Sequence, residues 1–137
     1  MLVLSYNARG LGGGEKREEV RNLVRDKNRF VLCIQESKLF VVDDMLIKSM
    51  WGDAPYAFSY KPSVGASSGF ITVWDSSRVV VWSCMSLAHV LVTQGTVLKT
   101  SEDFVIINMY APCDVMAKLT LWESLASLVS NNSDVCL

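Results

Sequence analysis

The feature of this sequence that most constrains its fold is a run of five apolar residues, 30–34, which Gln35 and Glu36 follow directly. A short run that is apolar throughout is typical of a strand buried on both faces, in the middle of a sheet. In α/β sheets, ligands bind outside the carboxyl ends of the strands, and Glu36 lies at that end. A charge at a strand end more often marks only the point where the chain reaches water. Glu36 is therefore a candidate site residue only if other polar residues reach the same edge.

Two further strands deliver polar residues at their carboxyl ends. Asn7 follows a strand predicted over residues 1–6, and Asn108 and Tyr110 end one predicted over residues 104–110. Side chains alternate along a strand, so Asn108 and Tyr110 share a face and emerge together. Amide and carboxylate oxygens suit Mg²⁺ or Mn²⁺, and a tyrosine hydroxyl can donate to a phosphate oxygen. The set favours metal-assisted hydrolysis of a phosphate ester, although it has few carboxylates and no general base.

Patterns elsewhere predict the remaining elements. Apolar stripes predict helices over residues 15–27, 42–50 and 114–130. Further strands are predicted over residues 56–61, 70–74, 78–85 and 89–99, the last either continuous or broken at Gly95. The short turns between these strands favour antiparallel pairing. The first predicted helix carries a basic stripe of Arg17, Arg21 and Arg25, for which a solvated face is the default and a phosphate contact the alternative.

Length and composition limit the protein class. The chain has 137 residues, enough for one domain with a core, and its 50% hydrophobic content indicates a globular protein. A net charge of −1 provides no general basic surface, so any contact with nucleic acid must be local. The four cysteines are far apart, mostly in apolar runs, and suit reduced, buried thiols. With no secretory leader and no run of membrane-spanning length, we expect an intracellular protein, nuclear or cytoplasmic, that is neither secreted nor membrane-bound.

One motif indicates a different chemistry. Residues 65–69 match G-x-S-x-G, the nucleophile elbow of serine hydrolases, and Asp75 and His89 follow in the required order. The elbow needs a strand before the serine and a helix after it, whereas here a strand is predicted to follow. The hydrolase interpretation is therefore disfavoured, and His89 is expected to be an ordinary strand residue.

Four segments, in order along the chain, resemble motifs of the endonuclease/exonuclease/phosphatase superfamily, and specifically the apurinic-type endonuclease domain of plant LINE (non-LTR) retrotransposons. They are LSYNARGLG at 4–12, CIQESKL at 33–39, SSGF at 67–70 and INMYAP at 107–112, with Lys118 and Trp122 in the helix that follows. The sequence departs from the family at Tyr6, which is commonly Trp, at Ser37, usually Thr, and at Phe70, usually glycine.

The resemblance implies a fold and a set of site residues. The fold would be a four-layer α/β/β/α sandwich of two mostly antiparallel sheets. Glu36 would bind the metal, Mg²⁺ or Mn²⁺, together with Asn7, which would also position the phosphate and its attacking water. Tyr110 would contact the scissile phosphate, with Asn108 as its neighbour. The substrate would be DNA, and a full-length element would carry a fused reverse transcriptase.

The last residues, 134–137, predict the beginning of another buried strand, so we expect residues 1–137 to be the N-terminal portion of a single domain, truncated before its later motifs. Those motifs, G-D-F-N and S-D-H, would supply the catalytic histidine. The family is a Mg²⁺-dependent endonuclease, but this portion is expected to be inactive alone. A non-catalytic remnant or interaction protein is the alternative, and a phosphatase of the same superfamily is a lesser one.

Overall fold

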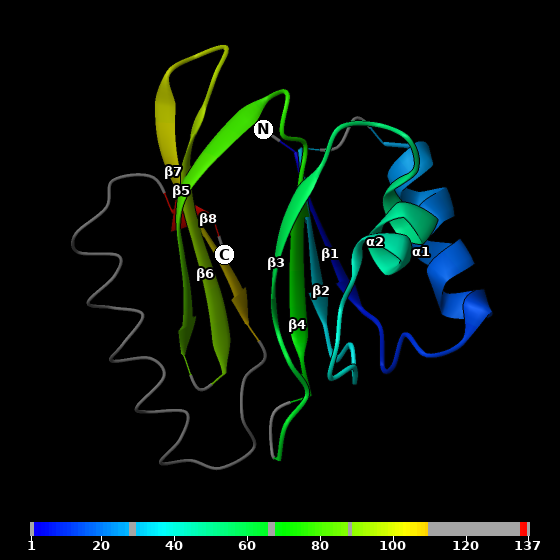
Figure 1. The fold of residues 1–137 in the computed structure, drawn as a ribbon. Helices are drawn as coiled ribbons and strands as arrows, with labels where there is room; N and C mark the ends of the chain where they lie inside the picture. Colours follow the sequence, from blue (N-terminus) through cyan, green and yellow to red (C-terminus); the bar gives the residue numbers. More distant parts are fainter. Residues whose placement is uncertain (1, 28–29, 66–67, 88, 110–134, 137) are drawn as a thin grey trace.

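The structure is a computed structural model that describes residues 2–27, 30–65, 68–87, 89–109 and 135–136. Two four-stranded sheets face each other, and two helices cover the outer face of the first sheet (Figure 1). The first sheet has the order β1 (Val3–Asn7), β2 (Val31–Gln35), β4 (Phe70–Trp74), β3 (Ala57–Lys61). The second has the order β5 (Val79–Leu87), β6 (Val90–Val97), β7 (Glu102–Met109), β8 (Val135–Cys136). The helices are α1 (Gly14–Arg25) and α2 (Asp44–Trp51).

Most strand pairs are antiparallel. β4 pairs antiparallel with both β2 and β3, and β5, β6 and β7 form an antiparallel meander. Only β1 with β2 and β7 with β8 are parallel. The α+β sandwich of two mostly antiparallel sheets is therefore confirmed. The helix predicted over residues 114–130 lies outside the described residues.

The central position predicted for β2 is confirmed, and its alternating side chains enter two different cores. Leu32 and Ile34 pack toward the helices, in a cluster that includes Val20 of α1 and Ile47 of α2. On the opposite face, the core between the sheets contains residues from both. These are Val31, Cys33 and Trp74 of the first sheet and Val79, Phe104 and Ile106 of the second.

The helices begin close to the predicted positions, and the deviation in α2 has a local cause. Asp43 is the N-cap of α2, because its carboxylate accepts a hydrogen bond from the Leu46 amide at 3.0 Å. Val42, predicted inside the helix, precedes the cap and is buried in the same cluster as Ile47. These two positions are those of a hydrophobic staple, which fixes the direction in which the chain enters the helix.

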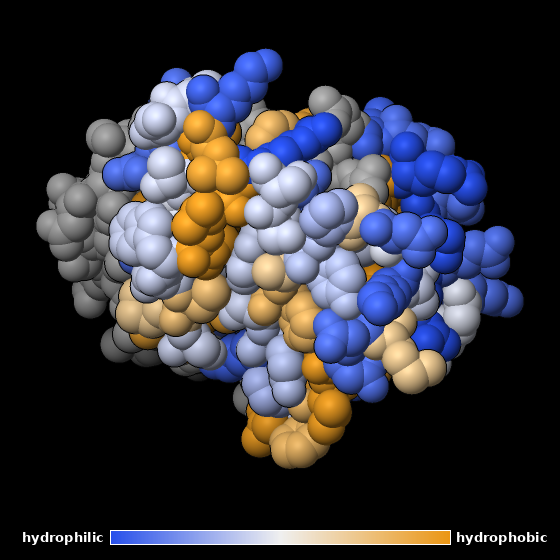
Figure 2. All heavy atoms as spheres, turned by 45° about the horizontal axis from the view of Figure 1, so that its top comes forward, coloured by the Kyte–Doolittle hydropathy of each residue, from blue (hydrophilic) through white to orange (hydrophobic). Residues whose placement is uncertain are grey.

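The three arginines of the basic stripe on α1 differ in exposure, since Arg17 is half-buried, with a buried Nε that forms no hydrogen bond among the described residues. Arg21 and Arg25 are exposed, and the Arg25 guanidinium lies 3.0 Å from the Asn22 side chain and 3.7 Å from the Asp26 carboxylate. Figure 2 shows a mainly hydrophilic surface on the right-hand side, where the helices lie in Figure 1. The default interpretation of this stripe is confirmed for these two arginines.

Strand β6 continues through Gly95, so the alternative of a break there is wrong. A side-chain Cβ at Gly95 would lie only 2.4 Å from the Val80 carbonyl oxygen. The register of β5 against β6 shifts between Val81 and Ser83, and this irregularity lies beside Gly95. Glycine is needed here because the neighbouring strand approaches closely, and not because the strand ends.

The thiols of Cys33 and Cys84 form no disulfide. Cys33 is buried between the sheets, as expected, whereas Cys84 is exposed on β5, contrary to the expectation of buried thiols. Strand β5 is at the end of its sheet, where alternate side chains reach solvent. None of the helices in the described ranges is long and apolar enough to span a membrane.

Candidate functional site

The loops that follow β1 and β2 are joined by hydrogen bonds at the carboxyl edge of the first sheet. Asn7 lies opposite Gln35 in the parallel register. Beyond the strands, the amides of Ala8, Gly10 and Leu11 donate in succession to the carbonyls of residues 35, 36 and 37, at 3.0, 2.8 and 2.9 Å. Asn7 and Glu36 thus reach the same edge of the sheet.

A third motif segment joins this edge. The Ser37 amide donates to the Gly69 carbonyl at 3.2 Å, and the Lys38 amide donates to the Ser68 carbonyl at 2.7 Å. Ser37 is fully buried, and its Oγ lies 2.4 Å from the point where a Cβ on Gly69 would be. Three of the four motif segments therefore form one hydrogen-bonded unit. Strand β4 begins immediately after Gly69, so the helix that a nucleophile elbow requires is not present at this point.

We expect Gly69→Ala to lower the free energy of unfolding by about 2 kcal/mol, because φ at Gly69 is +89° and the new methyl would displace the Ser37 hydroxyl. Gly65→Ala is the matched control, since Gly65 also has positive φ (+57°) but no atom within 4 Å of the added Cβ. Urea denaturation of the two variants separates crowding from backbone strain. Equal losses of stability in the two variants would show that the Ser37 hydroxyl moves away from the added methyl group without a penalty.

Left-handed backbone is concentrated at this edge. Among the described residues, four non-glycine residues have positive φ, and three of them are Arg9 (51°), Glu36 (52°) and Lys38 (56°). Such conformations are unfavourable by about 1–3 kcal/mol each and persist only where surrounding contacts enforce them, which happens most often at functional sites. The side chains of Arg9 and Lys38 are exposed, so this edge also carries two cations that sequence reasoning did not select.

The donor atoms at this edge fit a hard divalent cation. Glu36 is half-buried, and no described residue forms a hydrogen bond or ion pair with its carboxylate. Asn7 is exposed, and its Oδ1 accepts one hydrogen bond, from the Arg9 amide at 3.2 Å. No group of three or more His, Cys, Asp or Glu side chains that could hold a metal occurs within the described ranges. Two oxygen donors suit Mg²⁺ or Mn²⁺, which complete their shells with water and substrate phosphate.

Asn108 lies inside the sandwich. Its side chain is 1% exposed, and its Nδ2 donates to the carbonyls of Ile34 (3.2 Å) and Ile71 (2.9 Å) and to the Thr72 hydroxyl (3.2 Å). Its Oδ1 accepts a hydrogen bond from Gln35 Nε2 at 2.8 Å. These contacts join the second sheet to the first. A phosphate contact by Asn108 stays a prediction, and the structure assigns its amide to the protein interior.

Tyr110 and His89 are the other two residues for which the sequence made a prediction. Tyr110 lies outside the described residues, just after the end of β7 at Met109, so its role stays a prediction. His89 lies in the turn before β6 and not within a strand. Since Val90 pairs with Met109, the histidine is at the carboxyl end of β7. Periodicity did not reveal this, because a turn position depends on which strands pair.

Two ionisable side chains near this edge have shifted pKa values. Burial, followed by a 2.8 Å hydrogen bond to Glu19, raises the pKa of the Tyr6 hydroxyl and links β1 to α1. Lys61 donates to the Leu87 carbonyl on the second sheet, and burial lowers the pKa of its ammonium group. Both groups connect layers of the sandwich.

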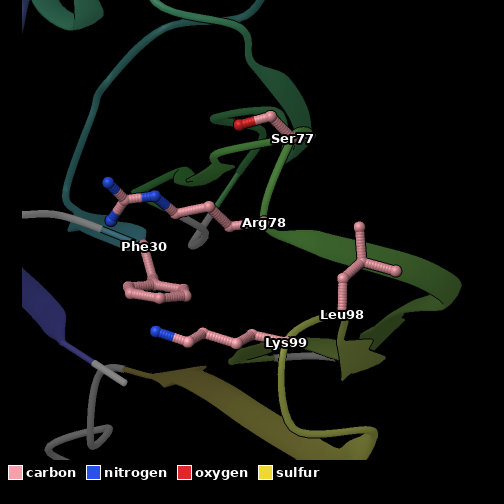
Figure 3. A pocket seen from close by; sticks show the side chains of 5 residues that line it. All are labelled: Phe30, Ser77, Arg78, Leu98 and Lys99. Carbon is pink, nitrogen blue, oxygen red and sulfur yellow. The ribbon is translucent and has the colours of Figure 1, made fainter.

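A pocket of about 630 Å³ lies at the opposite end of the sheets (Figure 3). It is lined by Phe30, Ser77, Arg78, Leu98 and Lys99. The Arg78 guanidinium lies 4.9 Å from the centre of the Phe30 ring, and its Nε is 3.5 Å from the Asp75 carboxylate. Phe30 precedes β2 whereas Glu36 follows it, so this pocket is separate from the candidate site.

No family model and no curated protein matches this sequence. Solved structures do match. The Xenopus laevis APE2 catalytic domain has a TM-score of 0.68 and 16% identity, over 98% of this chain and 56% of that one. The AP endonuclease LMAP from Leishmania major has a TM-score of 0.59 and 20% identity, over 86% and 43%. D. rerio TDP2, complexed with a single-strand DNA product, has a TM-score of 0.64 and 13% identity, over 97% and 56%.

This chain thus spans about half the length of those solved chains. At these identities the likeness shows the fold alone, and the fold that the motif resemblance implied is confirmed. The described part of the chain has the endonuclease/exonuclease/phosphatase fold.

Proposed function

We propose that this chain is the N-terminal portion of a divalent-metal-dependent endonuclease domain that hydrolyses phosphodiester bonds in DNA. The observation that carries the proposal is the convergence of Asn7 and Glu36, on hydrogen-bonded loops, at one edge of this fold. Two of the structural neighbours are an AP endonuclease and a protein crystallised with a DNA product, which supports DNA as the substrate class. The motif order supports an origin in a plant LINE element with a fused reverse transcriptase.

Each residue at the edge has a proposed role. The Glu36 carboxylate and the side-chain amide oxygen of Asn7 would hold Mg²⁺ or Mn²⁺, and Asn7 would also orient the scissile phosphate. The Tyr110 hydroxyl would donate a hydrogen bond to an oxygen of the scissile phosphate. The exposed Arg9 and Lys38 would neutralise neighbouring backbone phosphates, a contact that adds affinity without sequence preference. When bound, the metal would stabilise the negative charge that develops on the phosphate.

We also propose that residues 1–137 are one part of this domain and do not hydrolyse DNA alone. The family's later motifs supply the aspartate and histidine that activate water, and general-base catalysis contributes about 10²–10⁴-fold to the rate. His89 is the chain's single histidine, and its position in the sequence, before the INMYAP segment, does not match that of the family's catalytic histidine, which would follow residue 137.

Plasmid nicking tests the proposal directly. With Mg²⁺, the 137-residue chain should show negligible nicking, and a version extended through the later motifs should nick, losing about 100-fold or more on Glu36→Ala. The same substitution at the exposed Glu18 of α1 is the control and should leave nicking unchanged.

Other outcomes support the alternatives. An extended version that folds but cleaves neither DNA nor phosphomonoesters is a non-catalytic remnant or interaction protein. Hydrolysis of a phosphomonoester without DNA nicking indicates a phosphatase. Robust nicking by the 137 residues alone, abolished by Glu36→Ala, would overturn the inactivity of this portion.

A further inference from the structure

Three polar side chains form a continuous hydrogen-bonded chain across β1, β2 and β7. Gln35 Nε2 donates to Asn108 Oδ1 at 2.8 Å and lies 3.2 Å from the Ser5 hydroxyl oxygen. The Ser5 hydroxyl also lies 3.4 Å from Gln35 Oε1, and Gln35 Nε2 lies 3.4 Å from the Cys33 carbonyl. Ser5, Gln35 and Asn108 are named here the cross-sheet brace. It joins two neighbouring strands of the first sheet to one strand of the second.

The cross-sheet brace lies directly beneath the candidate site. Ser5 is two residues before Asn7 on β1, and therefore on the same face of that strand. Gln35 is the last residue of β2 and immediately precedes Glu36. Asn108 also holds the carbonyls of Ile34 and Ile71, so it fixes the backbone of β2 and of its neighbour β4 next to this edge. The arrows of β1, β2 and β7 end at the same side of the sandwich (Figure 1).

A polar group in the layer between two sheets is unfavourable unless its hydrogen bonds are satisfied, and an apolar side chain would fill this space without that requirement. Every polar atom of the Asn108 side chain nonetheless has a partner. The residue next to the brace, Glu36, has a left-handed backbone that surrounding contacts must enforce. The buried hydrogen bonds of Asn108 therefore lie beside a residue, Glu36, whose backbone conformation needs support from its surroundings.

We propose that Ser5, Gln35 and Asn108 are positioning residues, which hold the ends of β1 and β2 so that Asn7 and Glu36 present their oxygens to one divalent cation. The inference rests on the proposed function. The brace holds the strands from which Asn7 and Glu36 extend, so we expect its loss to weaken metal binding at the low end of the 10–100-fold range that is typical when the groups supporting metal ligands are removed.

Mn²⁺ alone is the probe, and the readout is paramagnetic broadening of the Asn7 and Glu36 amide signals in ¹⁵N-correlation spectra of the 137-residue chain. Gln35→Met keeps the length of the side chain and removes the hydrogen bonds of its amide group to Ser5, Asn108 and the Cys33 carbonyl. We expect it to raise the Mn²⁺ Kd about 10-fold, with the circular dichroism spectrum unchanged. Gln94→Met is the matched control, because Gln94 is the other glutamine, is likewise half-buried, and lies on β6 outside the brace; its Kd should equal that of the parent chain.

Glu36→Gln distinguishes a missing metal site from a brace that does not support the metal site. It should abolish the selective broadening, and unchanged broadening would remove the metal site and with it the proposed function. If Glu36→Gln abolishes broadening while Gln35→Met binds Mn²⁺ like the parent chain, the brace proposal fails and the proposed function stands. Should Gln35→Met unfold, Ser5→Ala at the exposed end of the brace replaces it. A raised Kd then supports the brace, and an unchanged Kd overturns it.

Discussion

Replacing Asn108 with leucine should lower the free energy of unfolding by about 3 kcal/mol or more, because leucine has nearly the same shape but no polar atoms. The substitution removes the donor to the carbonyls of Ile34 and Ile71 and the acceptor for Gln35, all at a position only 1% exposed. Each buried polar group left without a partner costs about 1–3 kcal/mol. Urea denaturation followed by circular dichroism measures the loss.

Asn22→Leu is the matched control for this prediction. Asn22 is exposed on α1, where its Oδ1 accepts a hydrogen bond from Arg25 at 3.0 Å. Exposed interactions of this kind contribute little, so the change should stay within about 0.5 kcal/mol. A loss below about 1 kcal/mol for Asn108→Leu would mean that the hydrogen bonds between the sheets are replaced at little cost, and would contradict the structural role given to Asn108.

Gly95→Ala should be the other strongly destabilising substitution, with a loss of about 3 kcal/mol. The added Cβ would lie 2.4 Å from the Val80 carbonyl oxygen, 2.9 Å from Phe104 Cζ and 3.1 Å from Val81 Cα. Two of these atoms belong to the backbone of β5, so relief of the clash requires β5 and β6 to separate where their register shifts. Thermal unfolding and urea denaturation report the effect.

Gly12→Ala is the control for Gly95→Ala. Gly12 is exposed in the loop after β1, and nothing lies within 4 Å of a Cβ built there. Its substitution should change stability by about 0.5 kcal/mol or less, or stabilise slightly, since alanine restricts the unfolded chain. Equal stabilities of the two variants would show that β5 moves away from Gly95 without penalty.

Much of the candidate site could be predicted because it depends on strand ends. The apolar run before Gln35 identified β2 as a central strand, and polar residues at the ends of β1 and β2 indicated that Asn7 and Glu36 share an edge. The structure places them there. The resemblance of the four motifs also predicted the fold. Three of the motifs lie where a strand ends, and the SSGF segment lies where β4 begins.

The structural role of Asn108 was not predictable in the same way. Alternation placed it on the same face of a strand as Tyr110, which suggested a position at the rim. Its partner Gln35 is 73 positions away along the chain, and no local pattern relates the two. Gly95 is a similar case. The sequence allowed a break in the strand at this glycine, whereas the structure shows that the glycine lies beside an irregularity in the neighbouring strand β5.

The sequence by itself determined which segments become strands and helices, and which polar residues end them. These properties follow from the periodicity of apolar side chains and from caps such as Asp43, which act over a few residues. Only the tertiary structure decided that Gln35 is joined to Ser5 and Asn108, that Ser37 fills the space beside Gly69, and that Glu36 has a left-handed backbone. The physical reason is that hydrogen-bond partners and close backbone approaches depend on which distant strands pair and pack together. Glu36, first visible as a charge after an apolar run, is thereby held at an edge that two sheets build together.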